Sequence, residues 1–180
     1  EPFLIGHRWA LLVLALLLCQ RLAALYTLGV SYSLGSDDID YLQSGITFAR
    51  TGMLTMHEDY CPSAQIMPGM PVLIGLFSLL FGEGMGLWAA LKLLWVLMGT
   101  LTAWFVYRSV CIFAPQWCGV AAMLCLFRAD FVWMDNLLLT ETPFLLALTA
   151  AAYYTFMMAK APGWRYFWCC AAAYMFGLMF

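Results

Sequence analysis

Charged residues are scarce in this chain of 180 residues. Asp, Glu, Lys and Arg make up 10% of it and hydrophobic residues 65%, whereas about 25% of the residues in an ordinary globular domain are charged. A chain of this length cannot cover so much apolar surface with its own residues, but a lipid bilayer can. The composition excludes a soluble globular domain and predicts an all-α, polytopic transmembrane helical bundle. The net charge of −2 gives no reason to expect nucleic acid as a partner.

The seven cysteines form no CxxC pair and no Cys/His pattern with the spacing of metal ligands. The sequence therefore favours neither a disulfide framework nor a zinc site. The first apolar run also lacks an A-x-A-like cleavage pattern, so we interpret it as a membrane anchor and not as a signal peptide. Because the chain begins without Met and stops inside an apolar run, we expect it to be the N-terminal fragment of a larger protein.

Long apolar runs predict where the chain crosses the membrane. The segment 68–81 is apolar but only about 14 residues long, which favours a re-entrant or juxtamembrane helix over a spanning one. Before it lies a long polar connection, 31–67, which we expect to be an external loop. The expected spans are 9–30, 85–107, a shorter one at 117–133, 136–158, and an incomplete one at 166–180.

The sidedness of the charges depends on whether the segment 68–81 crosses the membrane. If it does not, every acidic residue except Glu1 lies on one side of the membrane. The basic residues that then lie on the other side are Arg8, Arg108, Lys160 and Arg165. If the segment does cross, Arg108 moves to the outside. The positive-inside rule favours the non-crossing topology, with a cytoplasmic N-terminus and an acidic external side.

Three carboxylates lie within four residues near the start of the external loop, in the run Ser36-Asp37-Asp38-Ile39-Asp40-Tyr41. Ser36 is a good helix N-cap, and acidic residues in a first turn stabilise the positive end of the helix dipole. Apolar residues then recur at helical spacing as far as Gly52, a natural helix stop. The pattern predicts an amphipathic helix that is too short and too polar to span, so we expect it on the membrane surface.

Carboxylates at a boundary between water and lipid are suited to general-base catalysis or to binding a divalent cation. A second acidic stretch, from Asp135 to Glu141, opens the fourth expected span. Clustered like charges raise one another's pKa, which helps a base to act near neutral pH. We take Asp37, Asp38 and Glu141 as candidate catalytic residues, and Asp37 and Glu141 as the ligands if a cation is bound. The alternative for Glu141 is that it only stabilises a helix dipole.

Three cations on the predicted external side can hold a phosphate leaving group: Arg50, Lys92 and Arg128. For each of them, taken singly, a structural ion pair is the favoured explanation. Tyr41, within the acidic run, completes the set of candidate substrate-binding residues. The loop run His57-Glu58-Asp59 can ligate a metal, although a solvated loop is the favoured interpretation there.

The order of these motifs resembles the first external loop of C-type (GT-C) glycosyltransferases. An apolar span is followed by Asp37-Asp38, Asp40-Tyr41 and an amphipathic helix that ends in Arg50-Thr51-Gly52. The motifs that come next are Pro68-Gly69-Met70-Pro71, Leu80-Phe81-Gly82 and, two spans later, Thr140-Glu141-Thr142-Pro143-Phe144. This series resembles the branch of protein O-mannosyltransferases and lipid A aminoarabinose transferases. The resemblance covers roughly residues 9–160; each motif is weak alone, and their order and spacing together are specific.

The resemblance implies transfer of a sugar from a polyprenyl- or dolichyl-phosphate donor to a lipid, glycan or protein acceptor. The reaction would take place on the non-cytoplasmic face of a membrane, here the bacterial cytoplasmic membrane, and usually with inversion. Asp37 would be the base that activates the acceptor, and Glu141 matches the position of a second acidic residue ahead of a proline. The run Ile66-Met67-Pro68-Gly69 stands where the aminoarabinose branch has Lys-Pro-Pro, which argues against that reaction. Metal dependence varies across the superfamily, so a divalent cation remains open as a cofactor.

A transporter is the main alternative from another functional class. The intramembrane cations Arg21 and Lys92 would then mark an ion or substrate path, because charges inside a bilayer are expensive and usually functional. Most of the acidic residues are expected at one interface and not near mid-membrane, which favours an enzyme. A non-catalytic membrane subunit is the third possibility. The sequence does not identify the sugar, the acceptor or the length of the lipid carrier.

Overall fold

The computed structural model describes residues 2–56, 62–63 and 66–180, with side chains from residue 8 onward. Every regular element in these ranges is a helix, which confirms the expected all-α class. The elements are α1 (Pro2–Leu28), α2 (Asp37–Thr51), α3 (Gly69–Phe81), α4 (Met85–Phe113), α5 (Gln116–Leu124), the 3-10 turn η1 (Cys125–Phe127), α6 (Ala129–Met134), α7 (Glu141–Lys160) and α8 (Trp164–Gly177).

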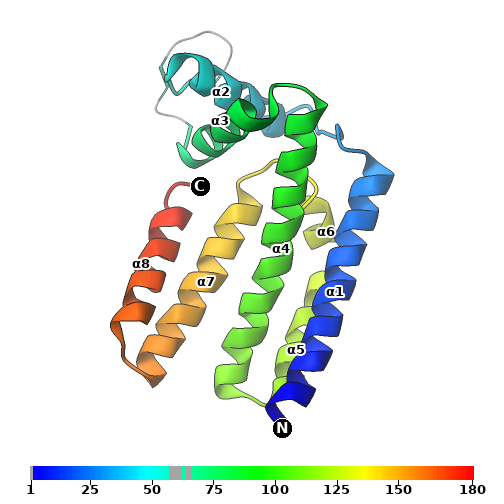
Figure 1. The fold of residues 1–180 in the computed structure, drawn as a ribbon, viewed down its shortest axis with the longest axis vertical. Coiled ribbons are helices and arrows are strands. Elements are labelled where there is room, and N and C mark those ends of the chain that lie inside the picture. The colour runs from blue at the N-terminus through cyan, green and yellow to red at the C-terminus, as the bar shows by residue number, and fades with distance from the viewer. Residues whose placement is uncertain (1, 57–61, 64–65) are drawn as a thin grey trace.

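Three of the helices are long and apolar enough to cross a membrane: Arg8–Leu28 within α1, Met85–Phe113 and Glu141–Lys160. Helix α4 lies between α1 and α7 and packs against both, and α8 packs against α7 (Figure 1). Helices α2 and α3 lie together across the upper end of this layer in Figure 1. The chain enters α4 and α7 from that upper end and leaves both at the lower end, where the N-terminus also lies.

The expected span at 117–133 is not a single helix. Helix α5 and η1 form one short apolar run, Gln116–Phe127, which is below spanning length. Arg128 then adopts an extended conformation (φ −58°, ψ 141°) before the short α6 begins. The break places Arg128 and Asp130 at the surface, where they form an ion pair of 2.6 Å. An unbroken apolar helix would instead have carried both charges within it, at a high cost in lipid.

Polar side chains of α1 lie against the broken segment. The Nε2 amide of Gln20 donates a hydrogen bond to the Phe127 carbonyl at 3.1 Å. A helix end leaves such carbonyls without an intrahelical partner, and a partner is needed wherever water is excluded. Gln20, a polar residue in the middle of the first apolar run, thus supplies the hydrogen bond that the carbonyl of Phe127 loses where the helical run ends early.

Helix α2 has nearly the bounds that the sequence predicts, and it ends at Gly52 in the left-handed conformation (φ 71°). Ser36 occupies the N-cap position, but its side chain makes no capping hydrogen bond. Helix α3 crosses α2 at very short range, because a Cβ atom on Gly45 would overlap the side chain of Ile74. Glycine at this position therefore lets the two helices form one unit.

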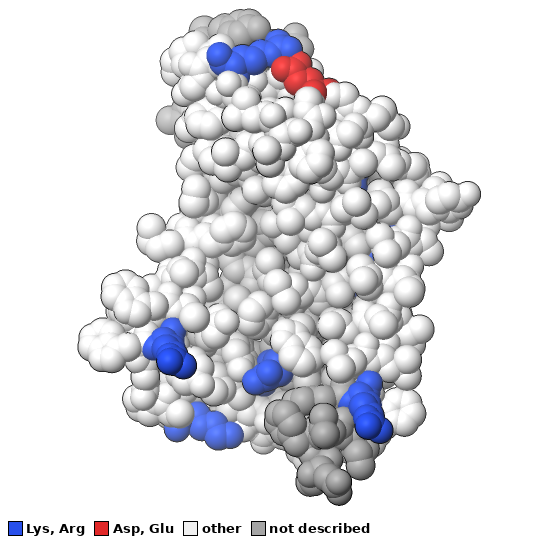
Figure 2. Space-filling view, in the orientation of Figure 1, with Lys and Arg blue, Asp and Glu red and all other residues white. Residues whose placement is uncertain are grey.

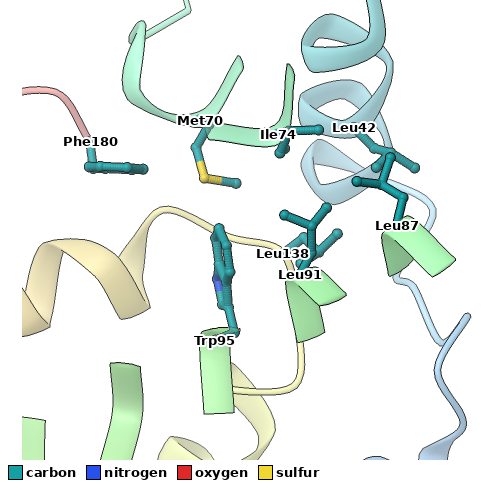
Figure 3. Packing of buried hydrophobic residues seen from close by; sticks show 8 residues of the cluster. All are labelled: Leu42, Met70, Ile74, Leu87, Leu91, Trp95, Leu138 and Phe180. Atoms are coloured by element: carbon teal, nitrogen blue, oxygen red, sulfur yellow. The ribbon is translucent and has the colours of Figure 1, made fainter. Parts of the chain in front are cut away.

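A buried apolar cluster attaches this two-helix unit to the long helices (Figure 3). Its members are Leu42 of α2, Met70 and Ile74 of α3, Leu87, Leu91 and Trp95 of α4, Leu138, and Phe180. Burial of one large apolar side chain stabilises a fold by about 1.5–3 kcal/mol, so a cluster of this size fixes α2 over the ends of α4 and α7. The start of α2 is thereby held near the start of α7.

Candidate functional site

The first turns of α2 and the first residue of α7 meet at the upper end of the molecule. The charges of Asp37 and Glu141 both act on the phenol of Tyr41, and the side chain of Thr140 lies beside that phenol. Both carboxylates are exposed, whereas Tyr41 is half-buried. Three residues that the sequence singles out separately therefore form one site. We call Asp37, Tyr41, Thr140 and Glu141 the acidic site.

The surroundings of Tyr41 keep its phenol protonated. Burial raises the pKa of Tyr41 above its ordinary value of 10.0, and the negative charges of Asp37 and Glu141 raise it further. The side chain of Thr140 acts in the opposite direction and does not reverse the shift. The site thus offers a hydroxyl donor between two carboxylates at any physiological pH.

Asp38 differs from its neighbour Asp37 because it is fully buried. Its carboxylate accepts backbone N–H bonds from Leu34 at 2.9 Å, Ser36 at 3.1 Å and Ile39 at 3.1 Å. Burial raises the pKa of Asp38, but these bonds and one from Ser33 outweigh it, so the pKa is below its ordinary value. We had expected Asp38 to share the catalytic work, and the geometry instead gives it a structural role in holding the turn before α2.

Lys92 does not face outward as the sequence analysis expects, because its side chain is fully buried. Its Nζ donates hydrogen bonds to the carbonyls of Tyr32, at 2.9 Å, and Asn136. The ammonium also lies 5.7 Å from the ring centroid of Trp88, within the range of a cation–π interaction. Lys92 therefore joins the loop after α1 to the loop before α7, and two of its three N–H donors bind protein carbonyls.

The two arginines proposed for phosphate binding lie in exposed ion pairs. Arg50 binds Glu83, with Nε and Oε1 separated by 2.8 Å, and Arg128 binds Asp130. Arg50 follows Asp37 by thirteen residues on the same helix, so about 20 Å separates them at about 1.5 Å per residue. Arg50 is therefore too far along α2 to assist chemistry at Asp37.

Arg21 and Asp135 form a buried ion pair that the sequence analysis misses. The Nε atom of Arg21 lies 2.6 Å from Oδ2 of Asp135, and the side chains are only 1% and 7% exposed. Thr142 donates a further hydrogen bond to the carboxylate at 3.1 Å, and a Cβ atom on Gly99 would overlap it. Asp135 thus belongs to the interior and not to the outward acidic stretch. Arg21 and Lys92 both have hydrogen-bond partners within the protein. Neither cation by itself therefore indicates a transport path.

The residues at the acidic site do not make a complete metal site. Among the residues with described side chains, no group of three or more His, Cys, Asp and Glu can hold a metal ion. Asp37 and Glu141 supply two carboxylates, and a divalent cation there would need its other oxygen ligands from substrate or water, so we derive no step through a cation. The loop run His57-Glu58-Asp59 lies outside the described residues.

No family model, no curated protein and no solved structure matches this chain. The functional argument therefore depends on the residues of this chain alone. The structure brings Asp37 and Glu141 near Tyr41, and it places Arg50 at the far end of α2. Thr140 is the additional member, and its place directly before Glu141 in the quoted motif is the signal that indicates it.

Proposed function

We propose that this chain belongs to an integral-membrane glycosyltransferase that moves a sugar from a polyprenyl-phosphate donor to an acceptor. The observation that carries the proposal is the convergence of Asp37 and Glu141, from two helices, on the protonated phenol of Tyr41. Exposed carboxylates beside a neutral donor are the groups that glycosyl transfer needs: a base for the acceptor and polar partners for the sugar and phosphate.

The proposed topology is multi-pass, in a bacterial cytoplasmic membrane. Helices α1, α4 and α7 cross it, the 14-residue α8 packs along α7, the broken segment α5–α6 returns the chain between α4 and α7, and α2 and α3 lie on the external surface. Arg8, Arg108, Lys160 and Arg165 lie at helix ends opposite the acidic site. On the face that Figure 2 draws, the described residues at that lower end include Lys and Arg but no Asp or Glu. The positive-inside rule makes this end cytoplasmic and the acidic site external.

In the proposed reaction, the Asp37 carboxylate accepts the proton of the acceptor hydroxyl. The acceptor oxygen then forms a bond to C1 of the sugar from the face opposite the phosphate, and the C1–O bond to phosphate breaks. The electron pair leaves with the polyprenyl phosphate, and the anomeric configuration is inverted. Tyr41 donates a hydrogen bond to a phosphate oxygen, and Glu141 accepts hydrogen bonds from sugar or acceptor hydroxyls.

The direct test uses the full-length protein in proteoliposomes with radiolabelled polyprenyl-phosphate sugars. Asp37→Asn should lower the transfer rate by about 10²–10⁴-fold, the usual contribution of a general base. Glu83→Gln is the matched control, because Glu83 is another exposed carboxylate at the same end and its loss should leave transfer unchanged. Wild-type rates from Asp37→Asn would remove the base from the mechanism. A wild-type protein that transfers none of the polyprenyl-linked sugars would refute the proposed function.

A further inference from the structure

A cavity of about 250 Å³ opens at the basic end of the molecule, between α4, α5 and α7. We define the basic end by Arg8, Arg108, Lys160 and Arg165, which lie at helix ends opposite the acidic site. Residues that line the cavity include Arg108 and Cys111 of α4, Gln116 at the start of α5, and Tyr153, Met157 and Lys160 of α7. The cavity thus places two cations from different helices around one space.

The guanidinium of Arg108 is held in place without a carboxylate. Its Nη2 donates a hydrogen bond to the hydroxyl of Tyr153 at 3.0 Å, and the group lies 5.6 Å and 5.4 Å from the ring centroids of Trp104 and Tyr153. Guanidinium has five N–H donors in a planar fork that suits phosphate oxygens. The one hydrogen bond to Tyr153 leaves other donors for a ligand.

Arg108 differs in this respect from the arginine in the interior and from the two that pair at the surface. Arg21, Arg50 and Arg128 each bind a carboxylate. In the described ranges, every acidic residue lies in α2, directly before α4, in or directly after α6, or at the start of α7. Among the described residues, therefore, no carboxylate balances the charge of Arg108 and of Lys160 at the basic end, and an anionic ligand would supply one.

Exposed aromatic side chains place the cavity at the level of lipid headgroups. Phe113 follows Arg108 on α4, Trp117 lies in the first turn of α5, and Trp164 begins α8; all three are exposed. Trp9 and Trp117 also contact each other, with ring centroids 6.2 Å apart. Aromatic residues gather in this way at membrane–water interfaces. A phosphate that reaches the cavity from this layer is most simply that of a lipid.

We propose that the Arg108–Lys160 cavity binds the phosphate group of an anionic phospholipid of the cytoplasmic leaflet. Basic pockets between transmembrane helices bind lipid headgroups in this way. The inference depends on the proposed topology, but not on glycosyl transfer. A soluble phosphate ester has the same chemistry at its anionic group, and the experiment separates the two sources.

The test measures lipid adducts on the full-length protein by native mass spectrometry in detergent. The probes are dioleoylphosphatidylglycerol and dioleoylphosphatidylcholine, with glycerol 3-phosphate as a soluble competitor. We expect phosphatidylglycerol to bind at least tenfold more tightly than phosphatidylcholine, and glycerol 3-phosphate not to displace it. Arg108→Gln and Lys160→Gln should each weaken phosphatidylglycerol binding about fivefold, as expected for one cation near a membrane surface.

Arg165→Gln is the matched control, because Arg165 is an exposed cation of the same end that does not line the cavity. Its affinity for phosphatidylglycerol should equal that of the wild type. Equal loss in Arg165→Gln would show diffuse attraction to a basic surface and would overturn the site, as would equal binding of the two lipids. Displacement by glycerol 3-phosphate would overturn the lipid source. If Arg108→Gln does not fold, the exposed Lys160→Gln variant still decides the question.

Discussion

The charged side chains at the two ends of this molecule have different partners. At the acidic end, Asp38 and Lys92 are buried and bound to backbone groups, which leaves Asp37 and Glu141 exposed around Tyr41. At the basic end, Arg108 and Lys160 border a cavity with no described acidic residue nearby. Buried charges in this chain therefore hold the fold together, and the charges available for ligands are the ones at the two surfaces. Three measurements can break or sharpen this distinction.

The largest expected effect is at the buried pair between the two ends. Arg21→Leu leaves the Asp135 carboxylate buried without its cation, and breaking such a pair costs about 3–5 kcal/mol. The double variant Arg21→Leu/Asp135→Asn removes the orphaned charge and keeps an acceptor for Thr142, so we expect it to recover more than half of the loss. The free energy of unfolding in detergent micelles, titrated with SDS, measures both effects.

Arg128 provides the control for that measurement. Its ion pair with Asp130 has the same nitrogen–oxygen distance of 2.6 Å, but its two side chains are 71% and 69% exposed. Exposed pairs contribute about 0–1 kcal/mol, so Arg128→Gln should change the stability little. If Arg21→Leu and Arg128→Gln lowered the free energy of unfolding equally, burial would not be what makes an ion pair important for the stability of this protein.

The next largest effect separates the two adjacent carboxylates. Asp38→Asn should destabilise the protein by about 2 kcal/mol, because the backbone N–H groups lose a charged acceptor. The amide that replaces the carboxylate has only one acceptor oxygen, and its NH₂ group cannot accept a hydrogen bond from these N–H groups. Asp37→Asn should cost at most about 1 kcal/mol, the contribution of a carboxylate to a helix dipole. Thermal unfolding in detergent at neutral pH measures the difference.

The pH dependence of that difference has a definite sign. The folded pKa of Asp38 is below its ordinary value of 3.8, so its contribution is complete above that value and is lost as the pH falls through the folded pKa. The gap in stability between the wild type and Asp38→Asn should therefore close in acid and stay constant above about pH 5. A gap that persists unchanged at the lowest pH would show that the charge of Asp38 is not what stabilises the turn.

Local patterns in the sequence predict much of this fold. Apolar runs give the all-helical class and the long helices, and the polar–apolar period with Gly52 gives the bounds of α2. The expectation that Asp37 and Glu141 share one site depends on topology, because both lie where the chain enters or leaves the same end. These features depend on composition and on spacing within a few turns, which a single sequence contains.

Three of the features that the sequence did not predict correctly depend on contacts between distant residues. Residues 117–133 are apolar enough to suggest one helix, and the break at Arg128 depends on α1 side chains that donate hydrogen bonds to the freed backbone carbonyls. The sequence suggests that Lys92 is available to bind a ligand, but in the structure its ammonium group binds the carbonyls of Tyr32 and Asn136. Arg21 and Asp135 are separated by 114 residues, and no periodicity within either segment indicates that they meet.

The smallest expected effect tests the acidic site without reference to activity. The negative charges of Asp37 and Glu141 help to raise the pKa of Tyr41, after burial, so removing either charge should lower it. A titration of ¹³Cζ-labelled tyrosine by NMR, with Tyr41→Phe to assign the signal, should show a lower Tyr41 pKa in Asp37→Asn and in Glu141→Gln. Glu83→Gln should leave the pKa unchanged, because Glu83 is paired with Arg50. If neither Asp37→Asn nor Glu141→Gln moves the Tyr41 pKa, the two carboxylates do not share a site, and the acidic end would lose the feature that distinguishes it from the basic one.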